Sequence, residues 1–339
     1  MSRVSRARRV AMTAVYGGGT VGAAGAVLLG VLAGEARLAR RTVGEPTTAP
    51  PVADGVYGLP PGATATAEPL VLTVLGDSSA AGFGVDTADQ TPGALIAVGL
   101  SDVADRPVRL VNAAVVGARS ADLLTQAIAV LEQHPQVAVV MVGANDVTHR
   151  VRPVTSVRHL SQAVRALREA GVAVVVGTCP DLGTVEPIAQ PLRLVARRWS
   201  RALAASQTIA VVEAGARTVS LGDLLGAEFA AAPRVMFSAD GFHPSASGYA
   251  RVASALLPSV AAALGLLPEE EPSAVLTAAG GVSSLAEAAV MAVEEPGTEI
   301  SGTAVGGQER GPWGRWVVLR RRIRQVTGRP ADPLPEGSR

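Results

Sequence analysis

Residues 70–84 have the sequence LVLTVLGDSSAAGFG. The apolar run Leu70–Leu75 has the length of a strand, and its lack of polar alternation is typical of a strand buried on both faces. Gly76, Asp77 and Ser78 follow directly, at the point where a chain that leaves a strand must turn. A buried strand with a polar turn at its end predicts a parallel sheet that carries its chemistry at one edge.

Apolar runs and helical segments continue to alternate from here to about residue 265. Four further strands are predicted at Val108–Val116, Val137–Val142, Val172–Gly177 and Ile209–Glu213. Helices are predicted at Pro92–Leu100, Ala121–Leu131, Ser156–Ala170, Pro191–Ser206 and about Ser247–Leu264. Strands that alternate with helices in this way favour an α/β fold, a doubly wound five-stranded parallel sheet with helices on both faces.

Polar motifs follow the first three predicted strands. Gly76–Ser78 follow the first strand, Gly117 follows the second, and Gly143–Asp146 (GAND) follow the third. Because the carboxyl ends of parallel strands share one edge of a sheet, we expect these motifs to lie close together. Asp240–His243 (DGFH) precede the last predicted helix, a place from which a loop could fold onto the same edge.

Ser78, His243 and Asp240 have the chemistry that nucleophilic catalysis needs. A serine hydroxyl becomes a nucleophile when a base removes its proton and a third group orients the base. His243 is the candidate base. Asp240, three residues earlier, is placed to accept a hydrogen bond from the other ring nitrogen and so to fix the tautomer. Ser79 adjoins Ser78, and the chemistry alone does not rank the two hydroxyls.

Attack on an acyl carbonyl also creates an oxyanion, which needs hydrogen-bond donors about 3 Å away. The candidate donors are the N–H groups of Ser78 and Gly117 and the side-chain amide of Asn145. Taken singly, each motif has a structural explanation, because Gly and Asn-Asp pairs are common in turns and an Asp before a helix can be a cap. Four such motifs on one predicted edge favour a catalytic site.

The four motifs, in this order, resemble the sequence blocks of the SGNH (GDSL-type) hydrolase superfamily. The first block matches residues 76–84, the second matches Gly117 in NAAVVGARS, the third matches residues 143–146, and the last matches residues 240–243. The resemblance extends over about residues 70–265, and no block is missing.

This resemblance implies a flavodoxin-like fold and a serine esterase that uses neither a metal nor an organic cofactor. It also favours Ser78 over Ser79 as the nucleophile. The site residues that it implies are the triad of Ser78, Asp240 and His243, and the oxyanion-hole donors of Ser78, Gly117 and Asn145.

The composition argues against several other classes of function. One cysteine and four histidines, with no H-E-x-x-H motif, leave little material for a metal site. Aromatic residues make up only 3% of the chain, which disfavours the stacking surfaces of single-strand nucleic-acid binders. There is no G-x-S-x-G motif, so the nucleophile elbow of an α/β-hydrolase is not expected. Cys179, near the predicted cleft, is expected to be a buried small side chain.

The first 41 residues form a separate basic segment, with seven Arg and one Glu. An uncharged run from Val10 to Gly34 is long enough to cross a bilayer, which takes about 20 residues. We therefore predict an uncleaved single-pass membrane anchor at about residues 10–34, with a cleaved secretory signal as the alternative. The arginines before the run favour a cytoplasmic N-terminus and an extracytoplasmic body.

Residues 42–69 and 266–339 flank the predicted hydrolase domain of residues 70–265. The first flank is rich in Pro, Gly, Ala and Thr, shows no strand or helix period, and is predicted to be a linker. The second flank is predicted to be a largely disordered tail.

A basic amphipathic helix is predicted within this tail, at about residues 313–326. Apolar side chains recur there at spacings of three and four and are surrounded by arginines. Such a helix could contact anionic lipid, or it could stay solvated or bind a partner. The residues between the two basic ends carry 15 Arg against 26 acidic residues, so the body is acidic and no nucleic-acid partner is expected.

The sequence as a whole predicts a membrane-anchored bacterial serine esterase that acts as a monomer. Its expected substrates are carboxylic esters of lipids or of the cell envelope, cleaved through an acyl-serine intermediate. A carbohydrate or cell-wall O-acetyl esterase is the alternative among enzymes. A catalytically idle envelope scaffold is the alternative outside them.

Overall fold

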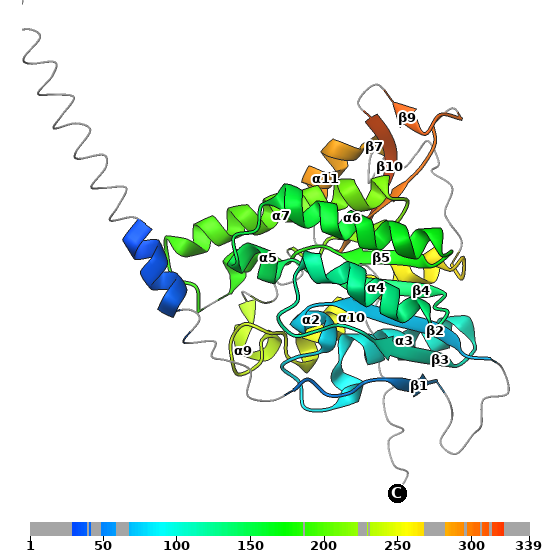
Figure 1. Cartoon of the computed structure of the whole chain (residues 1–339), viewed down its shortest axis with the longest axis horizontal. Coiled ribbons are helices and arrows are strands. Elements are labelled where there is room, and N and C mark those ends of the chain that lie inside the picture. Colours follow the sequence, from blue (N-terminus) through cyan, green and yellow to red (C-terminus); the bar gives the residue numbers. More distant parts are fainter. Residues whose placement is uncertain are drawn as a thin grey trace, which may run out of the picture.

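The computed structural model describes residues 29–38, 41, 49–58, 68–185, 187–222, 229, 231–267, 282–294, 297–305, 307–311 and 314–321. Over these residues the chain forms one mixed sheet between layers of helices (Figure 1). The strands are β1 (Gly55–Tyr57), β2 (Leu70–Gly76), β3 (Val108–Asn112), β4 (Val137–Met141), β5 (Ala173–Gly177), β6 (Arg217–Val219), β7 (Val282–Ser284), β8 (Thr298–Gly302), β9 (Arg310–Gly311) and β10 (Gly314–Arg321). The helices are α2 (Ser78–Ala81), α3 (Pro92–Ala104), α4 (Leu123–Leu131), α5 (Ala144–Thr148), α6 (Pro153–Glu169), α7 (Leu192–Glu213), α9 (Pro233–Met236), α10 (Ala246–Ala263) and α11 (Leu285–Glu294).

The predicted parallel sheet is the centre of a larger one. Strands β3, β2, β4, β5 and β6 pair in that order, all parallel. The prediction of five strands is wrong for the whole sheet, because β1 adds to β3 and β8 adds to β6, both antiparallel. The chain moves from β2 to β3 on one side and then to β4 on the other. The carboxyl ends of β2 and β4 therefore lie at a topological switch point, where crevices form in such sheets.

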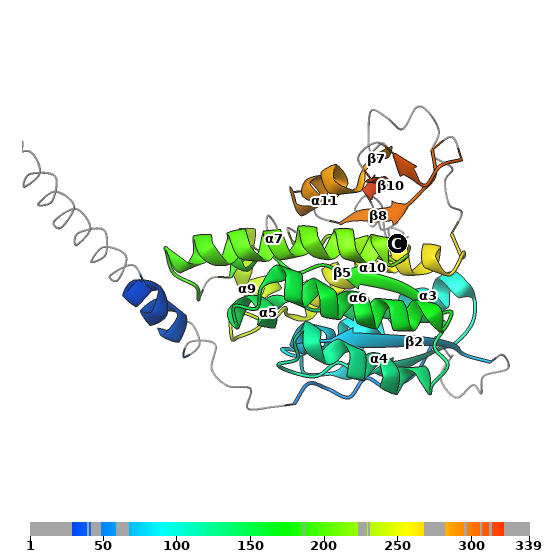
Figure 2. The ribbon, with the colours of Figure 1, turned by 45° about the horizontal axis from the view of Figure 1, so that its top comes forward.

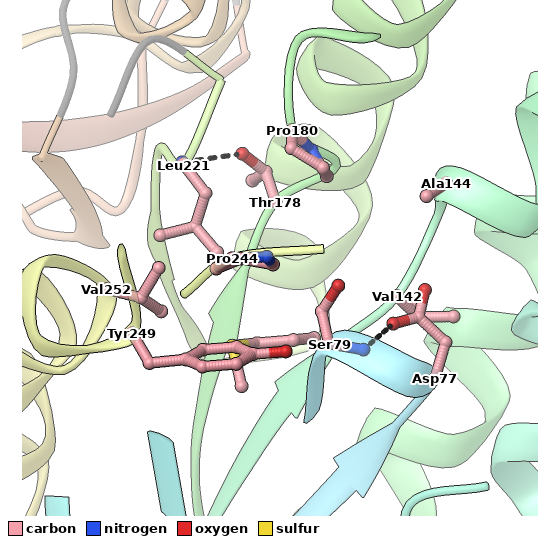
Figure 3. A pocket seen from close by; sticks show the side chains of 11 residues that line it. Asp77, Ser79, Val142, Ala144, Thr178, Pro180, Leu221, Pro244, Tyr249 and Val252 are labelled. Carbon is pink, nitrogen blue, oxygen red and sulfur yellow. Dashed lines mark hydrogen bonds between the residues drawn. The ribbon is translucent and has the colours of Figure 1, made fainter. Parts of the chain in front are cut away.

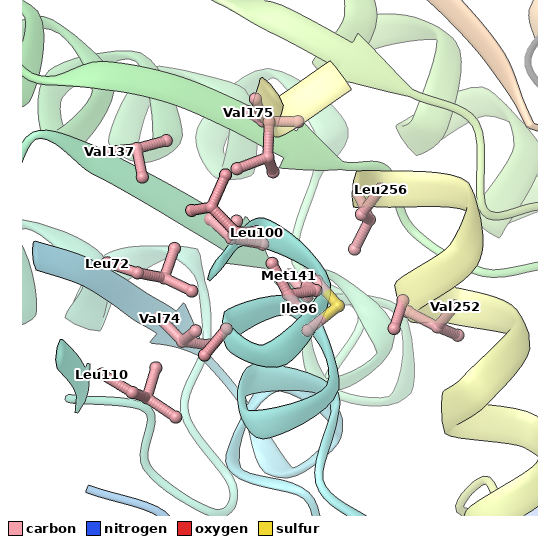
Figure 4. Packing of buried hydrophobic residues seen from close by; sticks show 14 of the residues in the cluster. Leu72, Val74, Ile96, Leu100, Leu110, Val137, Met141, Val175, Val252 and Leu256 are labelled. Atoms are coloured by element: carbon pink, nitrogen blue, oxygen red, sulfur yellow. The ribbon is translucent and has the colours of Figure 1, made fainter. Parts of the chain in front are cut away.

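Helices cover both faces of the sheet, as predicted (Figure 2). On one face, α3 and α10 pack over a cluster that includes Leu72, Ile96 and Leu256, all fully buried (Figure 4). On the other face, α4, α6 and α7 pack over a second cluster that includes Leu160 and Val176. Because β2, β4 and β5 are buried on both faces, their sequences are apolar runs without alternation.

The strand predicted at Ile209–Glu213 is wrong, since these residues form the last turns of α7. The β-branched residues there keep the helical spacing of the buried face, and no Pro or Gly interrupts the helix before Gly215, where φ is +78°. The fifth parallel strand is instead β6, which starts four residues after the end of α7 and is only three residues long.

The helix predicted at about residues 313–326 is also wrong over Gly314–Arg321, which form β10, while residues 313 and 322–326 lie outside the described part of the chain. Val317 and Leu319 alternate onto one face of this strand and pack with Ile300 of β8 and with α11. Strand β10 pairs with β8, so the prediction of a largely disordered tail is wrong for the described residues between 282 and 321, which extend the central sheet. Pairing with the edge of β8 overrides the helical spacing of Trp316 and Leu319.

Part of the predicted linker is ordered as well, because Gly55–Tyr57 form β1 against β3. Residues 42–48 and 59–67 lie outside the described part of the chain, as do residues 10–28 of the predicted anchor. Residues 29–38 are helical and lie beside the start of α7 (Figure 1). Among the described helices, none has both the length and the apolar character that crossing a membrane requires.

Gly76, at the end of β2, is expected to be a position where an added methyl group strongly destabilises the fold. Its φ is +139°, and an added Cβ would lie 1.8 Å from the carbonyl oxygen of Met141 on β4. We expect Gly76→Ala to lower the free energy of unfolding by about 3 kcal/mol or more, because the two central strands must separate. Urea denaturation of the purified protein measures this loss.

Gly171 provides the matched control. Its φ is +82°, yet no other atom lies within 4 Å of an added Cβ. Gly171→Ala should therefore cost only the strain of a left-handed alanine, about 1–2 kcal/mol. Equal losses in the two variants would show that the close approach of β2 and β4 does not limit stability.

Candidate active site

Ser78 lies at the tight turn between the central strand β2 and helix α2. The carboxylate of Asp77 accepts a hydrogen bond from the N–H of Ser79 at 2.9 Å and so caps the helix. Gly82, with φ of 81°, ends the helix after one turn. The short helix, closed at both ends by residues of the GDSSAAGFG block, places Ser78 at the carboxyl edge of the sheet.

The structure brings the three predicted triad residues into contact. Nε2 of His243 lies 2.9 Å from Oγ of Ser78, and Nδ1 of His243 lies 2.6 Å from Oδ2 of Asp240. These side chains come from positions 165 residues apart, which meet because the loop before α10 folds over the end of β2. This geometry also distinguishes the two adjacent serines, because it is the hydroxyl of Ser78 that contacts the imidazole.

Asp240 is held in place by donors on its second oxygen. Oδ1 accepts hydrogen bonds from Oγ of Ser238 at 2.8 Å and from the N–H groups of Phe242 and His243 at 2.8 and 2.9 Å. Burial alone would raise the pKa of Asp240, but the hydrogen bonds from His243 and from these N–H groups outweigh it and hold the pKa well below its usual value. Asp240 is therefore an anion that can orient the imidazole at any physiological pH.

Two aromatic rings that the sequence reasoning missed flank the imidazole of His243. The ring of Phe83 lies 4.5 Å from it and that of Phe242 lies 4.9 Å away, both measured between ring centroids. The hydroxyl of Tyr249, on α10, donates to the carbonyl of Phe83 at 2.6 Å and fixes that loop. Both phenylalanines lie inside the recognised blocks, but nothing in their spacing indicates a contact with the histidine.

The predicted oxyanion donors lie on neighbouring loops. The side-chain amide of Asn145, at the start of α5, donates to the carbonyl of Ala118 at 3.0 Å, which ties it to the loop of Gly117. The N–H groups of Ser78 and Gly117 make no hydrogen bond to any other described residue. Both N–H groups are therefore free to donate to a bound oxyanion.

Asp146 is buried, and its carboxylate holds the surrounding loops together through hydrogen bonds. One oxygen accepts from the N–H and the hydroxyl of Ser120, both at 3.0 Å, and the other accepts from the hydroxyl of Ser156 at 2.7 Å. These bonds join the loop after β3 to helix α6 and set the position of Asn145 between them.

Ser79 faces a separate small cavity of about 40 Å³ (Figure 3). Apolar side chains including Met141, Leu221 and Val252 line most of it, and neither Ser78 nor His243 does. Cys179 is buried as predicted, and burial raises the pKa of its thiol well above the usual value, so it stays protonated. Among the described residues there is no group of three or more metal-ligating side chains.

Asp77 gives the protein an expected dependence of stability on pH. Burial raises its pKa from 3.8 to about 6, against the opposing effects of the Ser79 N–H and the nearby His243. Between about pH 4 and pH 6 the folded protein keeps a proton that the unfolded chain has released, so the free energy of unfolding falls as the pH rises. This shift of about two pH units corresponds to about 3 kcal/mol.

The variant Asp77→Asn removes this titration, and its amide oxygen can still accept from the N–H of Ser79. A change in the hydrogen bond from the N–H of Gly143 would alter the stability equally at every pH. We compare the free energy of unfolding of the variant with that of the parent at each pH. The difference, variant minus parent, should rise by about 3 kcal/mol from pH 4 to pH 6 and stay constant above pH 7. Urea denaturation at a series of pH values measures the difference. Parallel stability curves for the two proteins would contradict the raised pKa.

Comparison with known proteins agrees with the motifs and the geometry. The model of the GDSL-like lipase/acylhydrolase family matches residues 74–251. The chain is 42% identical over 248 residues to a GDSL-like esterase of Mycobacterium tuberculosis, and the match covers 70% of this chain and 79% of that protein.

Two solved structures are also similar to this chain. The crystal structure of TesA shares 26% identity, covering 58% of this chain and 99% of TesA with a TM-score of 0.44. The psychrotrophic esterase EstA from Pseudoalteromonas shares 19% identity, covering 57% of this chain and 98% of EstA with a TM-score of 0.47. The family match spans all four polar motifs and more than half of the residues, so the chain belongs to the GDSL-like lipase/acylhydrolase family.

Proposed function

We propose that this protein is a serine esterase that cleaves carboxylic esters through an acyl-serine intermediate, with Ser78 as nucleophile. The observation that carries the proposal is the continuous chain of contacts from Oγ of Ser78 to the imidazole of His243 and on to the carboxylate of Asp240. The membership of an esterase family supports the same reaction class.

The proposed reaction starts when Oγ of Ser78 attacks the ester carbonyl carbon and its proton passes to Nε2 of His243. Asp240 stabilises the imidazolium that forms, because its carboxylate accepts from Nδ1. The N–H groups of Ser78 and Gly117 and the amide of Asn145 would hold the oxyanion. When this tetrahedral intermediate collapses, the alcohol leaves with the proton from His243 and the acyl group stays on Ser78. A water molecule then attacks the acyl-serine, again with His243 as the base, and the acid is released.

The direct test uses the full-length protein with a series of p-nitrophenyl esters and a fluorophosphonate probe. We expect turnover of at least one acyl length, and a single labelled peptide that carries the probe on Ser78. Labelling of Ser79 would overturn the assignment of the nucleophile. A complete lack of turnover and of labelling would instead support a catalytically idle scaffold.

The same assay separates the candidate substrates. We propose esters of lipids or of the cell envelope, which predict turnover of acyl groups longer than acetyl. Activity confined to acetyl esters, including those of an acetylated wall glycan, would favour the O-acetyl esterase alternative. The acting unit is proposed to be a monomer, because one chain supplies every member of the triad.

We also propose that residues 10–34 anchor the protein in the membrane, with the catalytic body outside the cytoplasm. The uncharged run and the arginines on its N-terminal side support this topology. A reporter fused after residue 45 should be active only outside the cytoplasm, and the protein should stay in the membrane pellet after a carbonate wash. A soluble product with a new N-terminus near residue 36 would favour secretion after cleavage.

A further inference from the structure

The helix of residues 29–38 contacts the first turn of α7. The N–H of Leu192, 157 residues further along the chain, donates to Oε2 of Glu35 at 2.9 Å. Leu32, Glu35 and Ala36, at spacings of three and one, form the half-buried side of this helix. Figure 2 shows the helix beside the same end of α7. Glu35 thus caps a helix of the catalytic body from the end of the N-terminal segment.

The first turn of α7 is in turn close to the catalytic loop. Nε of Arg193 donates to the carbonyl of Ile188 at 2.6 Å, which holds the preceding loop against the helix. In that loop, Cγ of Pro187 lies 3.3 Å from the position of an added Cβ at Gly241, between Asp240 and His243. Glu35 is therefore close to the loop that passes beside the triad residues.

Glu35 is also the first charged residue after the uncharged run that we propose as the anchor. The proposed anchor of residues 10–34 has 25 residues, and about 20 residues in a helix are enough to cross a hydrocarbon core of about 30 Å. Residues 29–38 would then leave the bilayer at its surface. Whatever contacts Glu35 must lie at that surface too, and this includes the start of α7.

Exposed aliphatic side chains surround the catalytic edge that would face the lipid. Four of them are between 55% and 77% exposed. Val115 is on the loop of Gly117, and Val154 is in the first turn of α6. Leu194 is in the first turn of α7, and Val235 is on α9. The exposed arginines on the same loops and on α9 are Arg119, Arg150, Arg152 and Arg234. Aliphatic side chains mixed with arginines favour contact with an anionic lipid surface.

We propose that the contact between Glu35 and α7 holds the catalytic edge of the sheet against the membrane surface, so that the enzyme takes its ester from that surface. The inference rests on the anchor and the esterase activity proposed above. It deepens them by stating which side of the body faces the lipid.

The orientation can be measured on the full-length protein in vesicles of phosphatidylglycerol and phosphatidylcholine that contain a nitroxide-headgroup lipid. Single cysteines carry a fluorescent dye at the catalytic edge (Val154→Cys, Leu194→Cys, Val235→Cys) or at the opposite edge (Val103→Cys, Leu266→Cys). The native Cys179 is buried. We expect about twofold or stronger quenching at the catalytic edge, because side chains at an interface insert about 5–10 Å.

Equal quenching at both edges, in protein that is membrane-bound and active, would overturn the inference and leave the proposed function intact. Protein that does not associate with the vesicles would overturn both the anchor and the inference. Lack of hydrolysis of a soluble p-nitrophenyl ester would count against the esterase activity itself.

A second variant tests the contact that sets the orientation. Glu35→Ala removes the cap of α7 and so weakens the contact that holds the orientation. Hydrolysis of a vesicle-borne ester should fall about fivefold, which is the change in the oriented population when one capping interaction is lost. Hydrolysis of a soluble p-nitrophenyl ester should not change, since Glu35 is outside the triad. Glu169→Ala, an exposed glutamate at the far end of α6, is the matched control and should behave as the parent. An equal loss on both substrates would contradict the orienting role.

Discussion

Ser78→Ala is expected to lower kcat for a p-nitrophenyl ester by about 10⁴-fold to 10⁶-fold, with the fold intact. The hydroxyl contacts His243 and makes no hydrogen bond on which the described fold depends. Its loss removes the proposed nucleophile and leaves only the contribution of the oxyanion donors and of substrate binding. Steady-state kinetics measure the loss, and thermal unfolding checks that the midpoint stays within a few degrees.

Ser79→Ala is the matched control, because it makes the same chemical change at the next residue. Its hydroxyl faces the separate cavity behind the turn, so kcat should stay close to that of the parent (Figure 3). Full activity in Ser78→Ala together with inactivity in Ser79→Ala would move the nucleophile by one position and refute the mechanism given above.

Asp240→Asn is expected to lower kcat by about 10⁴-fold for a different reason. Three donors converge on Oδ1, so the amide oxygen must stay there and the amide NH₂ must turn toward His243. Nδ1 then becomes an acceptor, which places the ring proton on Nε2, facing Ser78. The imidazole can no longer take the proton of the serine.

NMR of the imidazole nitrogens in the parent and in Asp240→Asn would show this change of tautomer directly. Asp122→Asn alters an exposed carboxylate that accepts from the N–H of Arg119 and, among the described residues, from no other donor; it should keep kcat within about twofold of the parent. An unchanged tautomer and an unchanged kcat in Asp240→Asn would show that the carboxylate does not orient the base.

Four of the five central parallel strands, and the residues proposed as the triad, could be predicted from the sequence because each has a local signal. Strands that are buried on both faces have apolar side chains throughout, so they appear in the sequence as apolar runs. The motifs Gly76–Ser78 and Asp240–His243 mark the turn that leaves the first strand and the loop that returns to the sheet. Because parallel strands end at one edge, Ser78 lies near the loops of Gly117 and Asn145. The loop before α10 then brings Asp240–His243 over the same edge.

The features that could not be predicted depend on partners distant in the sequence. Trp316 and Leu319 have the spacing of three that a helix needs, whereas Val317 and Leu319 alternate as in a strand, and only pairing with the edge of β8 decides between the two. Ile209–Glu213 has the composition of a strand, yet it continues the buried face of α7. The packing of Phe83 on His243 likewise depends on Tyr249 of α10, which no local pattern indicates.

The pairing of β8 with β6 has a consequence for how this enzyme can be divided. A chain ended at residue 267, just beyond the span of the family match, would uncover the backbone groups of β6 and take away Glu299, which lies 2.8 Å from the guanidinium of Arg217. Bare strands of this kind recruit other chains and aggregate. Recombinant versions should therefore extend past residue 321, and insertions that separate the C-terminal strands from the rest should be avoided.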